Sequence, residues 1–468
     1  MGASAGGIAW PALAAAHAGG AAFILLLPTH LYVAGGAITV AASFALVALV
    51  PHRLLAHADA LRLDLGSVCV PARRTLSTLA SLLSLALVIA LVVAGVAGSR
   101  DPLANPLPLF VWSVWWIGLS YAHAVLGNLW AHLNPWSGLQ RVMTAIGPFR
   151  RWDRTPPLIY SRQVACWPAV AGFLAFAWFE LIHPAPADPA VLAGMVAGYV
   201  LAHVAGVLLF GPEWLRRAES FTVFFRMISW VAPLAVRRRA ERASDAREPT
   251  EIGLTAPPLR LLSVEPPGPS GVAFVLLVLS AVSFDGLSRT FFWLGLLGVN
   301  PLVYPGRTAL MAPNTLGLLG LFGVLSLAYL LAVRLAAGAG ASRTFILSLV
   351  PIACGYHFAH YLPAFLVDVQ HALRAASDPF ALGWDLLGTR DLHVVTSFLT
   401  DPSRVYTIWH TQVALIVAAH VAGVVVAHAL ALRLTGGGPA ATLRQLPLLA
   451  LMIGYTMLGL WLLSTPSI

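Results

Sequence analysis

The stretch TFILSLVPIACGYHFAHYLPAFLVDV, residues 344–369, is long and apolar but contains His357, His360 and Asp368. About 20 consecutive apolar residues in a helix match the roughly 30 Å hydrocarbon thickness of a bilayer. Inside a bilayer the backbone has no water to bond, so a spanning run of this kind folds as a helix. The stretch therefore predicts a membrane-spanning helix with ionisable side chains at membrane depth.

The composition extends this prediction to the whole chain. Of 468 residues, 59% are hydrophobic and only 10% are charged, against about 25% charged residues in soluble domains. Alternating segments of the kind that build a transmembrane barrel are not seen. We therefore expect an all-α, polytopic integral membrane protein with about ten transmembrane helices, within a range of nine to twelve. The ten predicted spans are 31–50, 75–97, 109–126, 164–182, 190–210, 271–286, 314–335, 344–369, 406–432 and 443–464.

The arginines predict the orientation of these helices. All 28 basic residues are arginine, and 22 of them fall in or beside alternate loops, while six fall in the others. Cytoplasmic loops carry the excess of basic residues, so both termini are expected outside the cytoplasm. Loop position explains the net charge of +9 better than nucleic-acid binding does. Abundant Ala and Leu with no lysine are typical of a GC-rich bacterial genome, which predicts a bacterial inner-membrane protein whose first partner is the lipid bilayer.

The chain divides into four predicted parts. Residues 1–30 form an N-terminal leader, 31–210 a five-helix half, 211–270 a cytoplasmic segment and 271–468 a second five-helix half. Within the cytoplasmic segment, 213–234 mixes Arg with Trp and Phe, which predicts an amphipathic helix lying at the membrane interface. The charged sequence that follows it predicts a mobile linker.

The leader leaves two possibilities open. Ala14-Ala15-Ala16 is similar to a signal-peptidase site, but no basic region precedes it. Cleavage after Ala16 would expose His17, whose amine and imidazole could chelate copper. An uncleaved leader is the alternative.

Histidines at membrane depth form the candidate site. On a helix His360 lies at about −60° and Asp368 at about +20° from His357, so the three share one stripe. His420, in the predicted span 406–432, lies at a similar depth. Asp285 closes the span 271–286 on the same predicted outer side.

Ionisable groups inside a membrane normally face a partner or a cavity. Imidazole is a common metal ligand, so His357, His360 and His420 are expected to face one another and to bind a divalent metal, with Asp285 or Asp368 as ligand or general base. Neutral histidines that bond between helices are the alternative for each residue. Haem held by His357 or His360 together with His420 is the alternative for the cofactor.

Two further stretches stand out. The predicted outer loop 377–395 is expected to cap a pocket, or else to use its Asp residues in ordinary turns. NLWAHLNPWSGL (128–139) is expected to form an interfacial turn anchored by Trp130 and Trp136.

Several segments, in this order, resemble a bacterial membrane protein family known as fenitrothion hydrolases, which cleave organophosphate triesters. The segments are NLWAHLNPW, WPAVAGFLAFAWFELI, GPEWLRRAESF, VSFDGL, YHFAHYL, DPFALGWDLLGT and AAHVAGVVVAH, within about 105–435. The resemblance implies hydrolysis of a small hydrophobic substrate, and a bound metal would activate the attacking water. A copper- or haem-binding membrane protein is the alternative, as is a transporter, although a transporter predicts symmetric halves that the sequence does not have.

Overall fold

A computed structural model describes residues 29–51, 54–55, 62–68, 73–145, 156–238, 250–435 and 442–465. Residues 1–28 of the predicted leader, with His17, and residues 239–249 of the charged sequence lie outside these ranges. Helices dominate the described chain, and nine of them are long and apolar enough to cross a membrane. The chain is therefore a multi-pass, all-α membrane protein, as the sequence predicts.

All ten predicted spans coincide with helical segments. Nine are the long helices, and the tenth, predicted over 164–182, is the shorter helix α8 of 15 residues. The segments are α1 (Thr29–Ala48), α3 (Arg73–Ala97), α4 with η2 and α5 (Pro106–Leu126), α8 (Trp167–Leu181), α9 (Pro189–Phe210), α13 (Pro269–Ser288), α15 (Arg307–Ala337), α16 with η7 and α17 (Ser342–Ser377), α18 (Pro402–Thr435) and α20 (Leu446–Ser464).

Short elements complete the described chain. They are β1 (Arg62–Val68), α6 (Trp130–Leu133), α7 (Pro135–Ala145), α10 (Pro212–Arg217), α11 (Ser220–Ser229), β2 (Leu234–Arg238), β3 (Thr250–Thr255), α12 (Pro257–Arg260), η4 (Leu261–Ser263), α14 (Phe291–Leu296), η5 (Pro301–Val303), η6 (Ala339–Ala341) and η8 (Ser397–Leu399).

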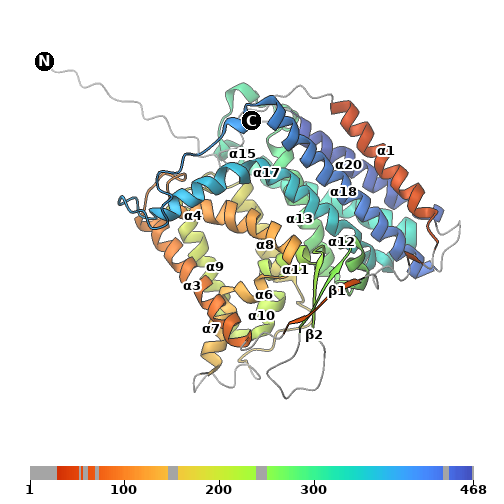
Figure 1. The fold of residues 1–468 in the computed structure, drawn as a ribbon. Helices are drawn as coiled ribbons and strands as arrows, with labels where there is room; N and C mark the ends of the chain where they lie inside the picture. Colours follow the sequence, from red (N-terminus) through yellow and green to blue (C-terminus); the bar gives the residue numbers. More distant parts are fainter. Residues whose placement is uncertain are drawn as a thin grey trace.

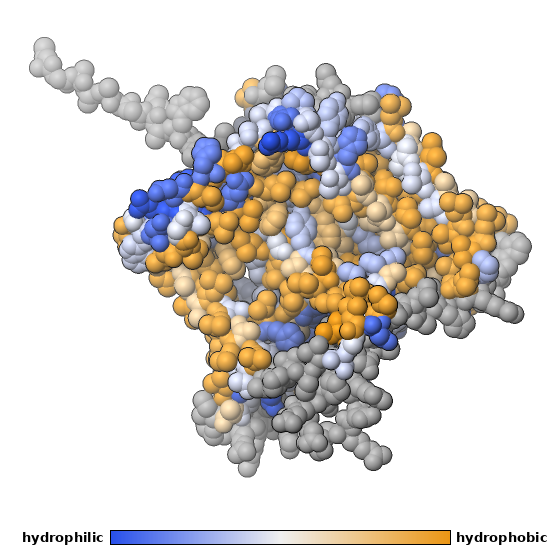
Figure 2. All heavy atoms as spheres, in the orientation of Figure 1, coloured by the Kyte–Doolittle hydropathy of each residue, from blue (hydrophilic) through white to orange (hydrophobic). Residues whose placement is uncertain are grey.

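Helix α17 is the central element of the fold. It packs against α18, α13 and the η2 part of the third span, while α1 and α20 lie together on the far side of α18 (Figure 1). Most of the segment 342–377 is buried inside the protein. Figure 2 shows apolar side chains across the middle of the molecule, which is the surface expected of a protein surrounded by lipid tails.

A small sheet joins two loops that lie far apart in the sequence. Its strand order is β1-β3-β2, and both pairings are antiparallel. The sequence predicted no strands here, because the extended segments are short and lie within loops rich in charge. The two paired loops are both among the arginine-rich ones.

Helix α11 differs from the interfacial helix predicted over 213–234. Its residues are buried around nearly the whole circumference, Phe224 and Phe225 almost completely. It packs against α8, α5 and α17. Its phenylalanines find partners among the aromatic side chains of the bundle, with Trp116 and Phe224 stacked at 4.9 Å between ring centroids. The structure therefore places this short helix inside the protein.

Close packing of α17 on α18 depends on Gly355. A Cβ atom built at this glycine would lie 2.3 Å from the Cβ of Ala419 and 3.0 Å from the carbonyl oxygen of Leu415. We expect Gly355→Ala to lower the free energy of unfolding by about 1–3 kcal/mol, because the two helices must separate. Thermal unfolding of the purified protein in detergent would measure this change.

The matched control for this substitution is Gly320→Ala in α15. Nothing lies within 4 Å of a Cβ built there, and replacing a helical glycine by alanine stabilises a helix by up to about 1 kcal/mol. Equal unfolding temperatures for the two variants would contradict this account of the α17–α18 contact.

Candidate functional site

A carboxylate and an imidazole meet where α13 and α17 pack together. Asp285, near the end of α13, is 1% exposed. His360 Nε2 donates to Asp285 Oδ2 at 2.8 Å, and Arg289 Nη2 lies 3.3 Å from Asp285 Oδ1. An ionised carboxylate can only accept, so a neutral imidazole in this pair carries its proton on Nε2 and its lone pair on Nδ1. The side chain of His360 remains 22% exposed.

Two tyrosines enclose His360. The Tyr356 ring is stacked on it at 6.0 Å, and the Tyr361 ring meets it edge-on at 4.8 Å. The imidazole is therefore oriented by Asp285 and held between two rings. No hydrogen bond to Nδ1 of His360 is found within the described part of the chain.

A second carboxylate continues the cluster. The Tyr361 hydroxyl donates to Glu180 Oε1 at 3.3 Å, from α17 to the buried end of α8. Arg307, at the start of α15, donates through Nη1 to the carbonyl oxygens of Glu180 at 2.9 Å and of His183 at 3.2 Å. We define the Asp285 cluster as Glu180, Asp285, Arg289, Arg307, His360 and Tyr361. Two carboxylates, two guanidinium groups and one imidazole thus converge from α8, α13, α15 and α17.

His357 lies at the edge of this cluster, where its ring is 4.9 Å from that of Tyr361, whereas His420 has no contact with a cluster residue in the described part of the chain. The ring of His357 lies 4.7 Å from that of Trp116, on η2. His420 Nδ1 donates to the carbonyl oxygen of Ile416 at 2.7 Å, and its ring lies 6.0 Å from that of Tyr455, on α20. The Nε2 atoms of both histidines are buried without a hydrogen-bond partner.

The predicted arrangement of three facing histidines therefore differs from the structure. No group of three or more His, Cys, Asp and Glu side chains that could hold a metal occurs among the described residues. His357 and His360 differ by about 60° around the axis of α17. Because several helices pack around α17, this angle is enough to direct the two side chains to different helices.

Asp368, the other predicted catalytic residue, lies apart from Asp285. It is buried on α17, and Ser113 Oγ on η2 donates to its Oδ2 at 3.4 Å. The η2 segment is a π-helix of nine residues, a rare conformation that occurs frequently at functional sites. It carries both Ser113 and Trp116, so it positions the partners of Asp368 and His357.

Sequence reasoning missed Glu219 as a buried hub in the first half of the chain. Glu219 is 0% exposed and caps α11 by accepting from Phe221 N at 3.0 Å and Thr222 N at 2.6 Å. Four side-chain groups also donate to it: Trp130 Nε1 (3.1 Å), Asn134 Nδ2 (3.3 Å), Tyr199 OH (2.5 Å) and, in a short contact, Thr222 Oγ1.

The signal for this hub was present in the sequence. NLWAHLNPW supplies Trp130 and Asn134, and GPEWLRRAESF supplies Glu219. The expected interfacial turn is instead a buried contact, with Trp130 and Trp136 both almost fully covered. Because these donors satisfy the carboxylate, the hub fixes α11 in place.

The loop after α17 uses its aspartates in turns. Asp378 accepts from Leu382 N at 2.9 Å and Gly383 N at 2.7 Å. Asp385 accepts from Ser377 Oγ at 2.6 Å and Arg390 N at 3.1 Å, and these hydrogen bonds lower its pKa. The aspartates therefore have the turn-forming role that the sequence left open beside the capping role.

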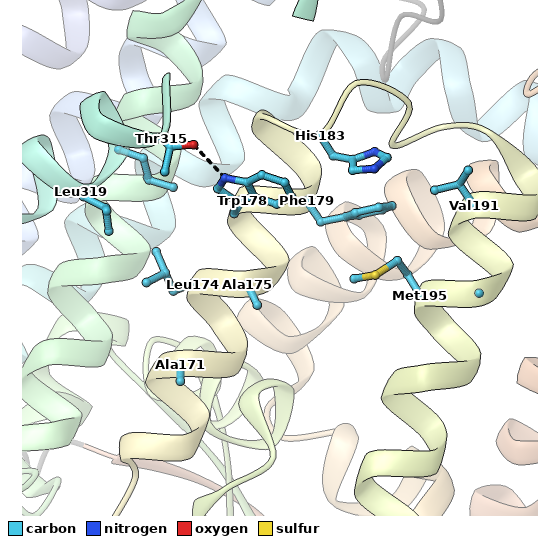
Figure 3. A pocket seen from close by; sticks show the side chains of 12 residues that line it. Ala171, Leu174, Ala175, Trp178, Phe179, His183, Val191, Met195, Thr315 and Leu319 are labelled. Atoms are coloured by element: carbon cyan, nitrogen blue, oxygen red, sulfur yellow. Dashed lines mark hydrogen bonds between the residues drawn. The ribbon is translucent and has the colours of Figure 1, made fainter. Parts of the chain in front are cut away.

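An apolar groove adjoins the Asp285 cluster. It has a volume of about 710 Å³ and lies between α8, α9 and α15 (Figure 3). Trp178, Phe179, Met195 and Thr315 line it, and Trp178 Nε1 donates to Thr315 Oγ1 at 2.9 Å. His183 also lines the groove, and its carbonyl oxygen accepts from Arg307, so the groove and the cluster share the end of α8.

Side chains of α8 and α9 that line the groove also border an aromatic cavity of about 220 Å³. Four tryptophans line it, and Ala175, Phe179 and Met195 line both this cavity and the groove. Side chains on α8 and α9 thus separate an open apolar groove from an interior apolar cavity.

Comparison of the chain with protein-family models, curated proteins and solved structures finds no match. The function is therefore inferred from the geometry of the Asp285 cluster and its surroundings.

Proposed function

We propose that the protein is a membrane-embedded hydrolase whose general base is His360, oriented by Asp285. The observation that carries this proposal is the 2.8 Å hydrogen bond from His360 Nε2 to the buried Asp285, while the other ring nitrogen has no hydrogen bond within the described residues. A carboxylate that orients an imidazole and stabilises the imidazolium is the arrangement of a general base. The cost of burying these groups at membrane depth favours a functional role over a purely structural one.

The proposed reaction is attack of water on a neutral phosphotriester or a related apolar ester. His360 Nδ1 accepts a proton as the water oxygen bonds to phosphorus, and the bond from phosphorus to the aryl oxygen breaks. The aryl oxide leaves with the electron pair, and the proton on His360 returns to bulk water. The guanidinium groups of Arg289 and Arg307 supply positive charge near the negative charge that develops.

The apolar groove supports a hydrophobic substrate. A neutral triester partitions into lipid, and a groove lined by Trp178, Phe179 and Met195 suits such a molecule. The end of the groove at His183 lies beside Arg307. The choice of phosphotriesters over other esters rests on the resemblance to the fenitrothion hydrolases.

The metal expected from the sequence does not fit the donor set of the described residues. His357, His360 and His420 are not grouped, and His360 and Asp285 bond directly to each other. We therefore propose no step through a metal, and a chelator tests this choice.

The substrate experiment uses purified protein in detergent or nanodiscs with a nitrophenyl thiophosphate triester. We expect nitrophenol to be released catalytically, and treatment with a chelator to leave the rate unchanged. Loss of turnover on chelation, restored by one divalent metal, would support the metal-dependent alternative. No turnover with any of a panel of phosphotriesters and carboxylic esters would rule out the hydrolase.

We also propose that both termini lie outside the cytoplasm of a bacterial inner membrane. The 22-to-6 division of the arginines supports this orientation. Pairing of β1 with β3 supports placing these two loops on one side of the membrane, and the arginines assign that side to the cytoplasm.

Reporter fusions test the orientation. Alkaline phosphatase, active only outside the cytoplasm, should be active when fused after residue 468 and inactive when fused within 239–249. The opposite pattern would invert the orientation, and activity at neither site would show that the number of crossings is not ten.

A further inference from the structure

A second pocket lies on the arginine-rich side of the protein, away from the Asp285 cluster. Its volume is about 600 Å³, and it is bounded by α10, α11, the start of α13 and α16. Four guanidinium groups line it, those of Arg216, Arg217, Arg226 and Arg343, with the carboxylates of Glu213 and Glu265. Three separate segments of the chain contribute these arginines.

The positive charge of the pocket is only partly neutralised. Glu213 pairs with Arg216 at 2.6 Å and with Arg217 at 3.0 Å. Arg226 Nη1 donates to the carbonyl oxygen of Arg216 at 3.1 Å, and Arg343 Nε donates to that of Pro267 at 2.9 Å. No ion pair of Arg226 or Arg343 with a carboxylate is found among the described residues. Backbone carbonyls thus hold both guanidinium groups in place without cancelling their charge.

The pocket also has an apolar lining. Trp230, Met227, Val223 and Phe274 contribute to it, and all but Trp230 are almost fully buried. A soluble anion needs only the arginines, whereas an amphiphile uses both the arginines and the apolar lining. Guanidinium groups favour phosphate as a ligand, because phosphate oxygens can accept two parallel N–H hydrogen bonds from one guanidinium group. Arginine-rich loops also lie where anionic lipids concentrate in a membrane.

We propose that this pocket binds a phosphate-bearing anion through Arg226 and Arg343. The phosphate belongs either to the headgroup of an anionic phospholipid or to a soluble phosphate compound. The inference does not depend on the hydrolase, because no residue of the Asp285 cluster lines the pocket.

The test compares three probes on the full-length protein. Phosphatidylglycerol and phosphatidylcholine are titrated in detergent and counted by native mass spectrometry, and inorganic phosphate is titrated by its effect on thermal unfolding. The variant is Arg226→Gln with Arg343→Gln. The matched control is Arg74→Gln with Arg334→Gln, which removes the same charge from exposed positions of α3 and α15 outside the pocket.

We expect saturable binding of phosphatidylglycerol or of phosphate to weaken by roughly tenfold or more in the variant, since each charged hydrogen bond contributes on the order of one decade of affinity. The control should change affinity by no more than about twofold. Saturation by phosphatidylglycerol alone identifies the lipid as the source, and saturation by phosphate alone identifies a soluble anion. Equal weakening in variant and control, or no saturable binding of any probe, would overturn the proposal. Arg343→Gln alone, at an exposed position, repeats the test if the double variant does not fold.

Discussion

Replacing His360 by alanine should reduce hydrolysis of a nitrophenyl thiophosphate triester by about 10²- to 10⁴-fold, the usual contribution of a general base. The loss should fall on kcat, because the imidazole accepts its proton in the transition state, while the groove that binds the substrate is unchanged. Asp285→Asn should give a loss of similar size. The amide can no longer stabilise the imidazolium, and its NH₂ group can favour the wrong tautomer. Nitrophenol release by purified variants measures both effects.

His357→Ala and His410→Ala are the matched controls for this prediction. His357 lies one turn from His360 but faces Trp116, and His410 lies on α18, where its Nε2 is 3.3 Å from the Tyr32 hydroxyl oxygen. His410 lies outside the Asp285 cluster, and His357 meets it only through a ring contact with Tyr361 at 4.9 Å. Neither hydrogen-bonds to Asp285, so both variants should keep kcat within about tenfold of the wild type. If His357→Ala loses as much turnover as His360→Ala while remaining folded, the base has been assigned to the wrong histidine.

Replacing Glu219 by alanine should destabilise the protein more than any other single substitution considered above. The change leaves the side-chain donors of Trp130 and Tyr199 buried without their acceptor, at about 1–3 kcal/mol each, whereas Asn134 Nδ2 still donates to Thr222 Oγ1. It also removes the cap of α11, which contributes about 1 kcal/mol. The expected loss is about 3–7 kcal/mol, so the variant should be unfolded or should melt far below the wild type. Thermal unfolding in detergent, followed by tryptophan fluorescence, measures it.

Glu213→Ala is the control for Glu219→Ala. Glu213 lies six residues earlier, in α10, and its side chain is 39% exposed beside Arg216 and Arg217. An exposed ion pair contributes about 0–1 kcal/mol, so this variant should melt close to the wild type. Similar melting of the two variants would show that the donors around Glu219 find other partners, and that this carboxylate does not fix α11.

The membrane class and the positions of the helices could be predicted from the sequence. The requirement for about 20 apolar residues per crossing is local, and it was enough to locate all ten helical segments, although α8 is shorter than predicted. It also identified His360 and Asp285 as candidate residues, because ionisable side chains stand out in an apolar run. The burial of α11, within 213–234, was not predicted. The arginines and aromatic residues of this stretch describe its composition, and composition does not say which neighbours will cover a helix.

Which polar groups meet depends on how the helices pack. Angles on one helix cannot say which helix packs on each side, so His357, His360 and His420 were expected together, whereas His357 faces η2, His360 faces α13 and His420 faces α20. The partners of Asp285 and Glu219 come from as many as 89 residues away in the sequence. Lipid tails cannot donate hydrogen bonds to a buried carboxylate. The donors of such a carboxylate are therefore side chains and backbone groups of the helices that pack around it. That packing depends on contacts such as Gly355 on Ala419, which no single helix specifies.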